Sequence, residues 1–181
     1  MSEKKDLRVI KTERAIYTAL VDLLKRKDLE KITVSELAQK AEINKATFYL
    51  HYIDIYSLYQ EALGKHIKEI IVEKGLLENM FSDPEEFARR LIDGFFNSDI
   101  MKDDPFFRNP NLIYNRSISY YICNAFTEQV ISDQLLPDTR ENVLKLEFFF
   151  TGIAFLRQDH SDDESDIIVR ILADSIRNLF L

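Results

Sequence analysis

The sequence predicts an all-α protein of about nine helices, and three observations support this fold class. Only four glycines and four prolines occur in 181 residues, which is few for a fold that needs many tight turns. Apolar residues recur at helical spacing along most of the chain. Ser, Thr, Asn or Asp precedes several of these segments, where such residues cap helix starts. Because 46% of the residues are hydrophobic, the chain can bury a proper core.

The first domain, residues 1–53, is predicted to hold three helices. In the first, from about residue 7 to 27, the apolar residues share one face: Ile16, Leu20, Leu23 and Leu24. Thr33 then begins a second helix, with Glu36 as its partner in a capping box. This helix can run only to about Ala41, because Asn44 is a strong N-cap residue that starts a third. Two short helices joined by a tight turn form a helix-turn-helix.

The second domain, residues 54–181, is predicted from the same signals. A long helix occupies residues 54–74 and is closed by Gly75. Asp83 and Pro84 begin the next helix, since proline is favoured at the first helical position. A turn of helix is expected at Asp104, and longer helices are expected from about residue 111 to 134, across residues 143–156 and after Ser161.

The last two helices carry more apolar surface than one chain of this size needs. Residues 143–156 are apolar almost all round, which is typical of a helix covered on more than one side. We therefore expect a homodimer, the alternative being that both helices are simply core of the monomer. Eight residues are the candidates for dimerisation: Phe148, Thr151, Gly152, Phe155, Ile168, Leu172, Ser175 and Ile176.

Composition argues against several other classes of protein. Cys123 is the single cysteine, so an internal disulfide is excluded, and we expect no metal or other cofactor. The N-terminus is charged and no run approaches the ~18 apolar residues of a membrane span, which predicts a cytoplasmic protein. A Gly-rich phosphate loop and a His-Glu-x-x-His motif are both absent, so we expect no enzymatic activity. The net charge of -7 is unevenly placed, since charges nearly balance in the N-terminal third.

Residues 44–56 concentrate large, half-polar rings in and after the predicted third helix. In a helix-turn-helix this helix enters the major groove, where short polar or basic groups reach base edges. Its first turn carries three such groups: Asn44, Lys45 and Thr47. Rings with a polar tip can pack against the core and still reach phosphate, which applies to Tyr49, His51 and Tyr52. The alternative is that these rings only seal a small helical core around Phe48.

Residues Ile32–Tyr59, ITVSELAQKAEINKATFYLHYIDIYSLY, resemble the helix-turn-helix domain of the TetR family of transcriptional regulators. The resemblance covers the capped second helix, the turn and two short motifs, Thr47-Phe48-Tyr49 and His51-Tyr52. It implies a homodimer that binds a partly palindromic double-stranded operator, as a repressor, and responds to a small-molecule effector. The alternative is a protein of the same fold that acts through a protein partner and binds DNA weakly or not at all.

The resemblance also implies roles for individual residues. The implied DNA contacts are Thr33, Asn44, Lys45, Thr47, Tyr49, His51, Tyr52 and, from the N-terminal arm, Lys11. The helices that would enclose a ligand carry the candidates for effector binding, although core packing is the competing interpretation: Phe95, Phe107, Tyr114, Arg116, Tyr120 and Tyr121. An inward-pointing Arg116 would require an anion.

Three residues depart from the family pattern. Glu42 stands in the turn where the family usually has glycine, and a positive φ there would cost on the order of 1 kcal/mol. Ala46 replaces a glycine and adds a methyl group that could contact a thymine methyl or merely support the helix. Ile55 replaces a lysine that contacts phosphate in the family. Each helix-turn-helix domain, called a head below, is therefore expected to lack one positive charge.

Overall fold

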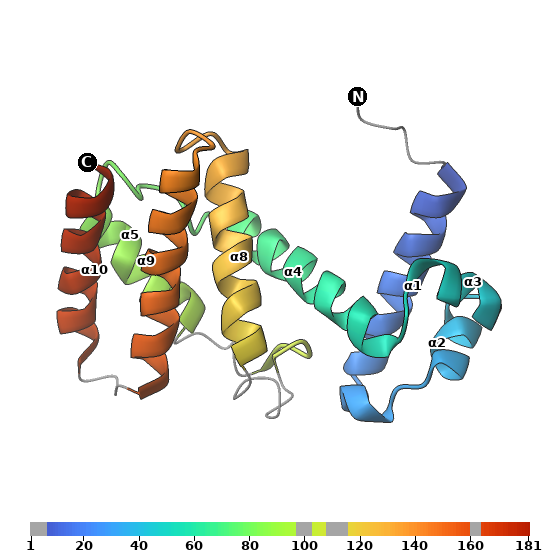
Figure 1. The fold of residues 1–181 in the computed structure, drawn as a ribbon. Helices are drawn as coiled ribbons and strands as arrows, with labels where there is room; N and C mark the ends of the chain where they lie inside the picture. The colour runs from blue at the N-terminus through green and yellow to red at the C-terminus, as the bar shows by residue number, and fades with distance from the viewer. Residues whose placement is uncertain (1–6, 97–102, 108–115, 160–163) are drawn as a thin grey trace. The chain divides into compact units, whose positions relative to one another are not determined.

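A computed structural model describes residues 7–96, 103–107, 116–159 and 164–181 (Figure 1). Within these ranges the chain forms eight α-helices and no strand, which confirms the predicted all-α class. No helix in the described ranges is both long and apolar enough to cross a membrane. The predicted helix starts at residues 111 and 161 lie outside the described residues.

The chain divides into two compact units, residues 1–63 and 64–181. The first unit contains α1 (Leu7–Leu24), a short 3-10 turn (Leu29–Lys31), α2 (Val34–Lys40), α3 (Lys45–His51) and the first half of α4 (Ile55–Glu73). The boundary expected from the sequence lies at the start of α4, whereas the contacts place it inside this helix. The N-terminal half of α4 therefore packs with the helix-turn-helix.

Side-chain caps define the helix-turn-helix. The Thr33 hydroxyl accepts a hydrogen bond from the Glu36 backbone N–H at 3.3 Å, and α2 begins there. The Glu36 carboxylate pairs with Lys27, so this side chain connects α2 to the turn that follows α1. Asn44 Oδ1 accepts from the Thr47 backbone N–H at 2.7 Å and starts α3. Between the two helices, Glu42 adopts a φ of +56°, the backbone conformation for which glycine is favoured.

The core of the first unit is built from one face of each helix. The largest fully buried side chains there are Ile16, Leu20, Leu29, Leu37, Phe48, Leu58 and Leu63. Phe48 is the α3 residue in this set, and it has no exposed surface. Burying a phenylalanine side chain contributes about 1.5–3 kcal/mol, so Phe48 anchors α3 and fixes which of its faces points outward.

The second unit is a helical bundle formed by α5 (Pro84–Leu91), α8 (Arg116–Ser132), α9 (Arg140–Asp159) and α10 (Ser165–Phe180) with the end of α4. Asp83 caps α5 by accepting from the Glu86 backbone N–H, and a π-helical turn, Ile92–Phe96, extends this helix. In this unit α8 packs along α9, and α10 packs on α5 (Figure 1). The core between them contains aromatic rings, among which Phe95 meets Phe126 edge to face.

Candidate nucleic-acid interface

The α3 helix presents a largely exposed surface opposite its anchor, Phe48. Lys45 and Ala46 are exposed in its first turn, and Tyr49 is 58% exposed in the second. Lys45 forms no ion pair or hydrogen bond through its side chain in the described part of the chain. Its ammonium is therefore available to an external anion.

The two polar residues at the start of α3 are already engaged with each other. Asn44 Oδ1 accepts from both the backbone N–H and the hydroxyl of Thr47, at 2.7 and 3.0 Å. The amide N–H groups of Asn44 donate to no other described residue and remain as donors, and Thr47 is half-buried. Thr33, at the start of α2, is exposed while its hydroxyl caps that helix. These caps order the surface before any ligand arrives, which reduces the entropy lost on binding.

The three polar rings of residues 49–52 differ in exposure: Tyr49 is exposed, His51 is half-buried and Tyr52 is buried. Tyr49 packs edge-on against Phe48, with ring centroids 5.4 Å apart, while most of its surface remains exposed. His51 is half-buried, and its Nδ1 lies 3.7 Å from Glu13 Oε1. Because Glu13 faces Nδ1, an anion that bound this ring would have to approach Nε2.

Tyr52 lies inside the first unit. Only 8% of the residue is exposed, and its hydroxyl donates to Glu61 Oε1 at 3.3 Å. Burial, reinforced by the negative charge of Glu61, raises the pKa of Tyr52 well above its usual value. Since the hydroxyl proton is already donated to Glu61 and the ring is covered, the structure argues against the expected phosphate contact. Tyr52 closes the head as the C-cap of α3.

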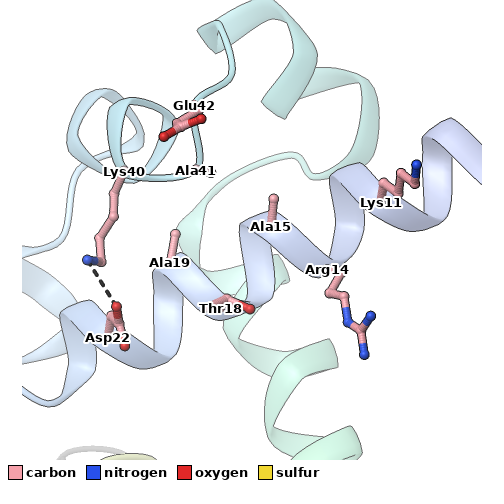
Figure 2. Close-up of a pocket in the computed structure, with 9 residues that line it drawn as sticks. All are labelled: Lys11, Arg14, Ala15, Thr18, Ala19, Asp22, Lys40, Ala41 and Glu42. Carbon is pink, nitrogen blue, oxygen red and sulfur yellow. Dashed lines mark ion pairs between the residues drawn. The ribbon is translucent and has the colours of Figure 1, made fainter.

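A hollow of about 420 Å³ lies between α1 and the end of α2, and it adds cations to this unit (Figure 2). Lys11 and Arg14 line it from α1, and neither forms an ion pair within the described residues. Lys40, by contrast, pairs with Asp22 at 3.0 Å, and this hydrogen-bonded cation lowers the pKa of the Asp22 carboxyl. Sequence reasoning named Lys11 and missed Arg14, although a spacing of three residues places both on neighbouring turns of α1.

The start of α4 contains Ile55, the residue that stands where the family pattern has a lysine. Ile55 is the first residue of α4 and is only 6% exposed. Asp54 caps this helix by accepting from the Ser57 backbone N–H at 2.7 Å, and the Ser57 hydroxyl accepts in return from the Asp54 N–H at 3.1 Å. A carboxylate therefore occupies the N-terminus of α4, next to a buried apolar residue where a lysine was expected to contact phosphate.

The comparison with protein families agrees with this geometry. Residues 16–62 match the model of the family described as bacterial regulatory proteins, tetR family. The N-terminal part of the chain is therefore similar to the regulatory proteins of this family. A Bacillus subtilis (strain 168) relative, the uncharacterized HTH-type transcriptional regulator YxbF, is 36% identical over 84 residues. That match covers 46% of this chain and 21% of YxbF, so the shared part spans about a fifth of that relative's length.

Several solved structures share the fold over most of the chain, among them two of TetR family regulators. AlkX, a TetR family repressor from a Dietzia species implicated in biodegradation of n-alkanes, aligns with a TM-score of 0.68 and 13% identity, covering 92% of this chain and 96% of that one. RolR without ligand aligns with a TM-score of 0.65 and 13% identity, covering 92% and 95%. A TetR transcriptional regulator from a Rhodococcus species aligns with a TM-score of 0.62 and 12% identity, covering 96% of this chain and 97% of that one. At these identities the likeness concerns the fold alone.

The expected dimerisation residues fall into two groups in the structure, one exposed and one buried or half-buried. On α9, Phe148 is 74% and Phe155 66% exposed, and Thr151 and Gly152 are exposed between them. On α10, three of the expected residues are buried in the protomer: Ile168, Leu172 and Ile176. Ser175 is half-buried and donates its hydroxyl to the Ile171 carbonyl at 2.7 Å.

The exposed apolar residues of α10 are displaced by one position from those expected. Ile167 and Ile171 are 50% and 49% exposed, whereas the adjacent Ile168 and Leu172 face the protomer core, where α10 packs on α5. The expected assignment of Ile168, Leu172 and Ile176 to an intermolecular surface is therefore corrected. Periodicity located the apolar side of this helix, but it cannot show that α5 already covers that side.

The expected ligand residues are mostly packed or lie outside the described side chains. Phe95 and Phe107 have no exposed surface and meet edge to face, with centroids 6.3 Å apart. Tyr121 is half-buried and Tyr120 is 60% exposed. Tyr114 and the side chain of Arg116 lie outside the description. A hollow of about 300 Å³ between α8 and α9 is lined by Tyr120 together with Ser119, Cys123, Asn124, Glu147 and Thr151.

Proposed function

We propose that this protein is a cytoplasmic, homodimeric transcriptional repressor that binds a partly palindromic DNA operator and releases it when a small molecule binds the second unit. The observation that carries the proposal is the outward surface of α3. There Lys45 is exposed without a partner in the described residues, on a helix whose start is fixed by Asn44 and whose inner face is fixed by Phe48.

The proposed contacts divide into those that read bases and those that position the protein. Lys45 and the Asn44 amide lie at the start of α3, the end of a recognition helix that meets base edges in the major groove. Tyr49 and His51 would bind phosphates on either side of the groove. Lys11 and Arg14 are unpaired within the described part of the head and add phosphate contacts from α1, which raise affinity without selecting a sequence.

The proposed dimer uses α9, where the exposed apolar side chains follow one another at helical spacing: Leu144, Phe148 and Phe155. An alanine at position 152 would place its Cβ in open space, so no packing within the protomer requires Gly152. A glycine on an exposed helical face instead lets a second backbone approach closely, although it costs about 1 kcal/mol of helix stability relative to alanine. Two α3 helices in one dimer would then match the two-fold symmetry of a palindrome.

The effector is proposed to act through linkage. A ligand that binds more tightly to a conformation with wrongly spaced heads lowers operator affinity by its differential affinity for that conformation. The hollow between α8 and α9 is a candidate entry site, because hydroxyl, amide and carboxylate groups converge on an otherwise apolar wall.

The start of α4 favours a second candidate function. Ile55 removes a cation, and Asp54 places a carboxylate at the adjacent helix end. Both changes weaken attraction to phosphate. The protein would then act as a co-regulator through a protein partner, and its own heads would bind DNA weakly.

A fluorescence-anisotropy titration separates the two functions. Labelled duplex DNA from beside the protein's own gene is compared with random duplex of equal length, without ligand, at low and physiological salt. A repressor should bind the former with a Kd of about 10⁻⁸ to 10⁻¹¹ M at physiological salt, at least about 10³ tighter than the random duplex. Lys45→Ala should weaken this binding, whereas Lys65→Ala, which removes an exposed lysine of the second unit, should not. Equal affinity for both duplexes at low salt would favour the co-regulator.

A further inference from the structure

The centre of the outward face of α3 is apolar. An α-helix turns by about 100° per residue, so residues two positions before and after a buried one lie on the opposite side. For Phe48, which is fully buried, these residues are Ala46 and Leu50. Ala46 is exposed, and Leu50 is 83% exposed although leucine is a residue that cores normally enclose.

Polar residues border this apolar ridge on both sides. By the same rotation, Lys45 and Tyr49 lie on one flank of the ridge, and Thr47 and His51 lie on the other. Lys45 and Tyr49 are exposed, and Thr47 and His51 are half-buried where the flank turns toward the core. The surface therefore has an apolar centre between two edges that can donate hydrogen bonds.

This order of groups fits the major groove of DNA. The groove has phosphates along both walls and base edges on its floor, and the floor offers a single kind of apolar group, the C5-methyl of thymine. The core of a protein–protein interface is instead enriched in large aromatic side chains and depleted in alanine, whereas the centre of this surface is formed by Ala46 and Leu50. Resting on the DNA-binding function above, we propose that Leu50, supported by Ala46, determines specificity by packing against thymine methyl groups in the operator.

The test removes single methyl groups from the DNA. The full-length protein is first used to select its preferred duplex from a random-sequence library. Each thymine of the selected duplex is then replaced by uracil, which pairs identically and lacks the methyl, and affinities are measured by fluorescence anisotropy. We expect binding to fall about fourfold at each thymine that Leu50 contacts, the value for one buried methyl group.

Two variants assign the effect to a residue. Leu50→Ala should bind the thymine and uracil duplexes equally well at those positions, because the apolar contact is gone. Ile53→Ala is the matched control, since Ile53 is also apolar and is 84% exposed but follows the end of α3. This variant should retain the fourfold effect of the wild type. Both side chains are exposed, so neither substitution is expected to unfold the protein.

The outcomes distinguish this inference from the function on which it rests. A selected duplex whose affinity is unchanged by uracil at every thymine would overturn the role of Leu50 and leave sequence-specific binding in place. An effect of uracil that persists in Leu50→Ala would overturn it as well. If no sequence is enriched over the starting library, the proposed DNA-binding function fails, and the inference fails with it.

Discussion

Replacing Ile55 with lysine should increase the affinity of the protein for DNA. Ile55 begins α4, where the TetR family resemblance implies a lysine that contacts phosphate. The substitution restores one positive charge to each head. It also places that charge beside Asp54, whose carboxylate caps the same helix. The gain in DNA affinity therefore depends on whether the added ammonium group interacts mainly with phosphate or with the Asp54 carboxylate.

The expected gain follows from counterion release. Each additional phosphate contact steepens the dependence of log K on log salt by about 0.9, which is roughly an eightfold gain in affinity at 0.1 M salt. Two heads would give about 60-fold. An exposed ion pair with Asp54 is worth at most about 1 kcal/mol and would reduce this gain without removing it.

The substitution also has a cost in stability, because Ile55 is only 6% exposed. Burying an isoleucine contributes about 1.5–3 kcal/mol, and lysine retains part of this by laying its aliphatic stem along the apolar surface while its ammonium stays in water. We expect the variant to lose about 1–2 kcal/mol of unfolding free energy, which urea denaturation would measure.

The assay is a titration of the selected duplex at several salt concentrations with wild type, Ile55→Lys and Ile55→Met. Methionine has a similar volume and no charge, so it controls for the repacking of the site. Only the lysine variant should bind more tightly and show a steeper salt dependence. If lysine and methionine variants gave the same affinity and slope while remaining folded, the reasoning about the missing charge would be refuted.

Three further predictions concern the fold, the assembly and the cysteine. Glu42→Gly should stabilise the first unit by about 1 kcal/mol in urea denaturation, because Glu42 has a φ of +56° and glycine adopts it freely; Glu42→Ala should give no such gain, and an unchanged midpoint for glycine would contradict the argument. Phe148→Asp should convert a dimer to a monomer in size-exclusion chromatography with light scattering, since Phe148 is 74% exposed on α9; a variant that kept the dimer mass would exclude α9 as the contact, and a monomeric wild type would exclude the homodimer. Cys123 should react slowly with iodoacetamide at pH 8 in the native protein and rapidly in urea, because burial raises the pKa of its thiol and keeps it protonated; rapid labelling of the native protein would show that the thiol is not enclosed.

Local signals in the sequence predicted the parts of the fold that short stretches of chain determine. Thr33 and Asn44 were recognised as N-caps because their side chains bond a backbone N–H three residues ahead, and the structure shows both bonds. The helix expected over residues 54–74 is observed as Ile55–Glu73 and is followed by Gly75 at a φ of +57°. Such features depend on residues that are close in the chain, so the sequence alone contains every residue that determines them.

Contacts between distant residues decided the rest of the candidate site. The Tyr52 hydroxyl donates to Glu61, and the Glu36 carboxylate pairs with Lys27. The sequence had predicted a phosphate contact for Tyr52 and a capping contact with Thr33 for Glu36. Only the packing on α5 shows that Ile168 is core while Ile167 next to it is exposed.

The sequence by itself thus determined the helical class, the capped helix-turn-helix and the family that it resembles, because periodicity and caps act over a few residues. The tertiary structure alone decided which polar and apolar groups of those helices stay exposed, as the proposed contacts with DNA and a second chain require. Whether a side chain is exposed depends on the element that packs over it, and that element can lie far away in the sequence.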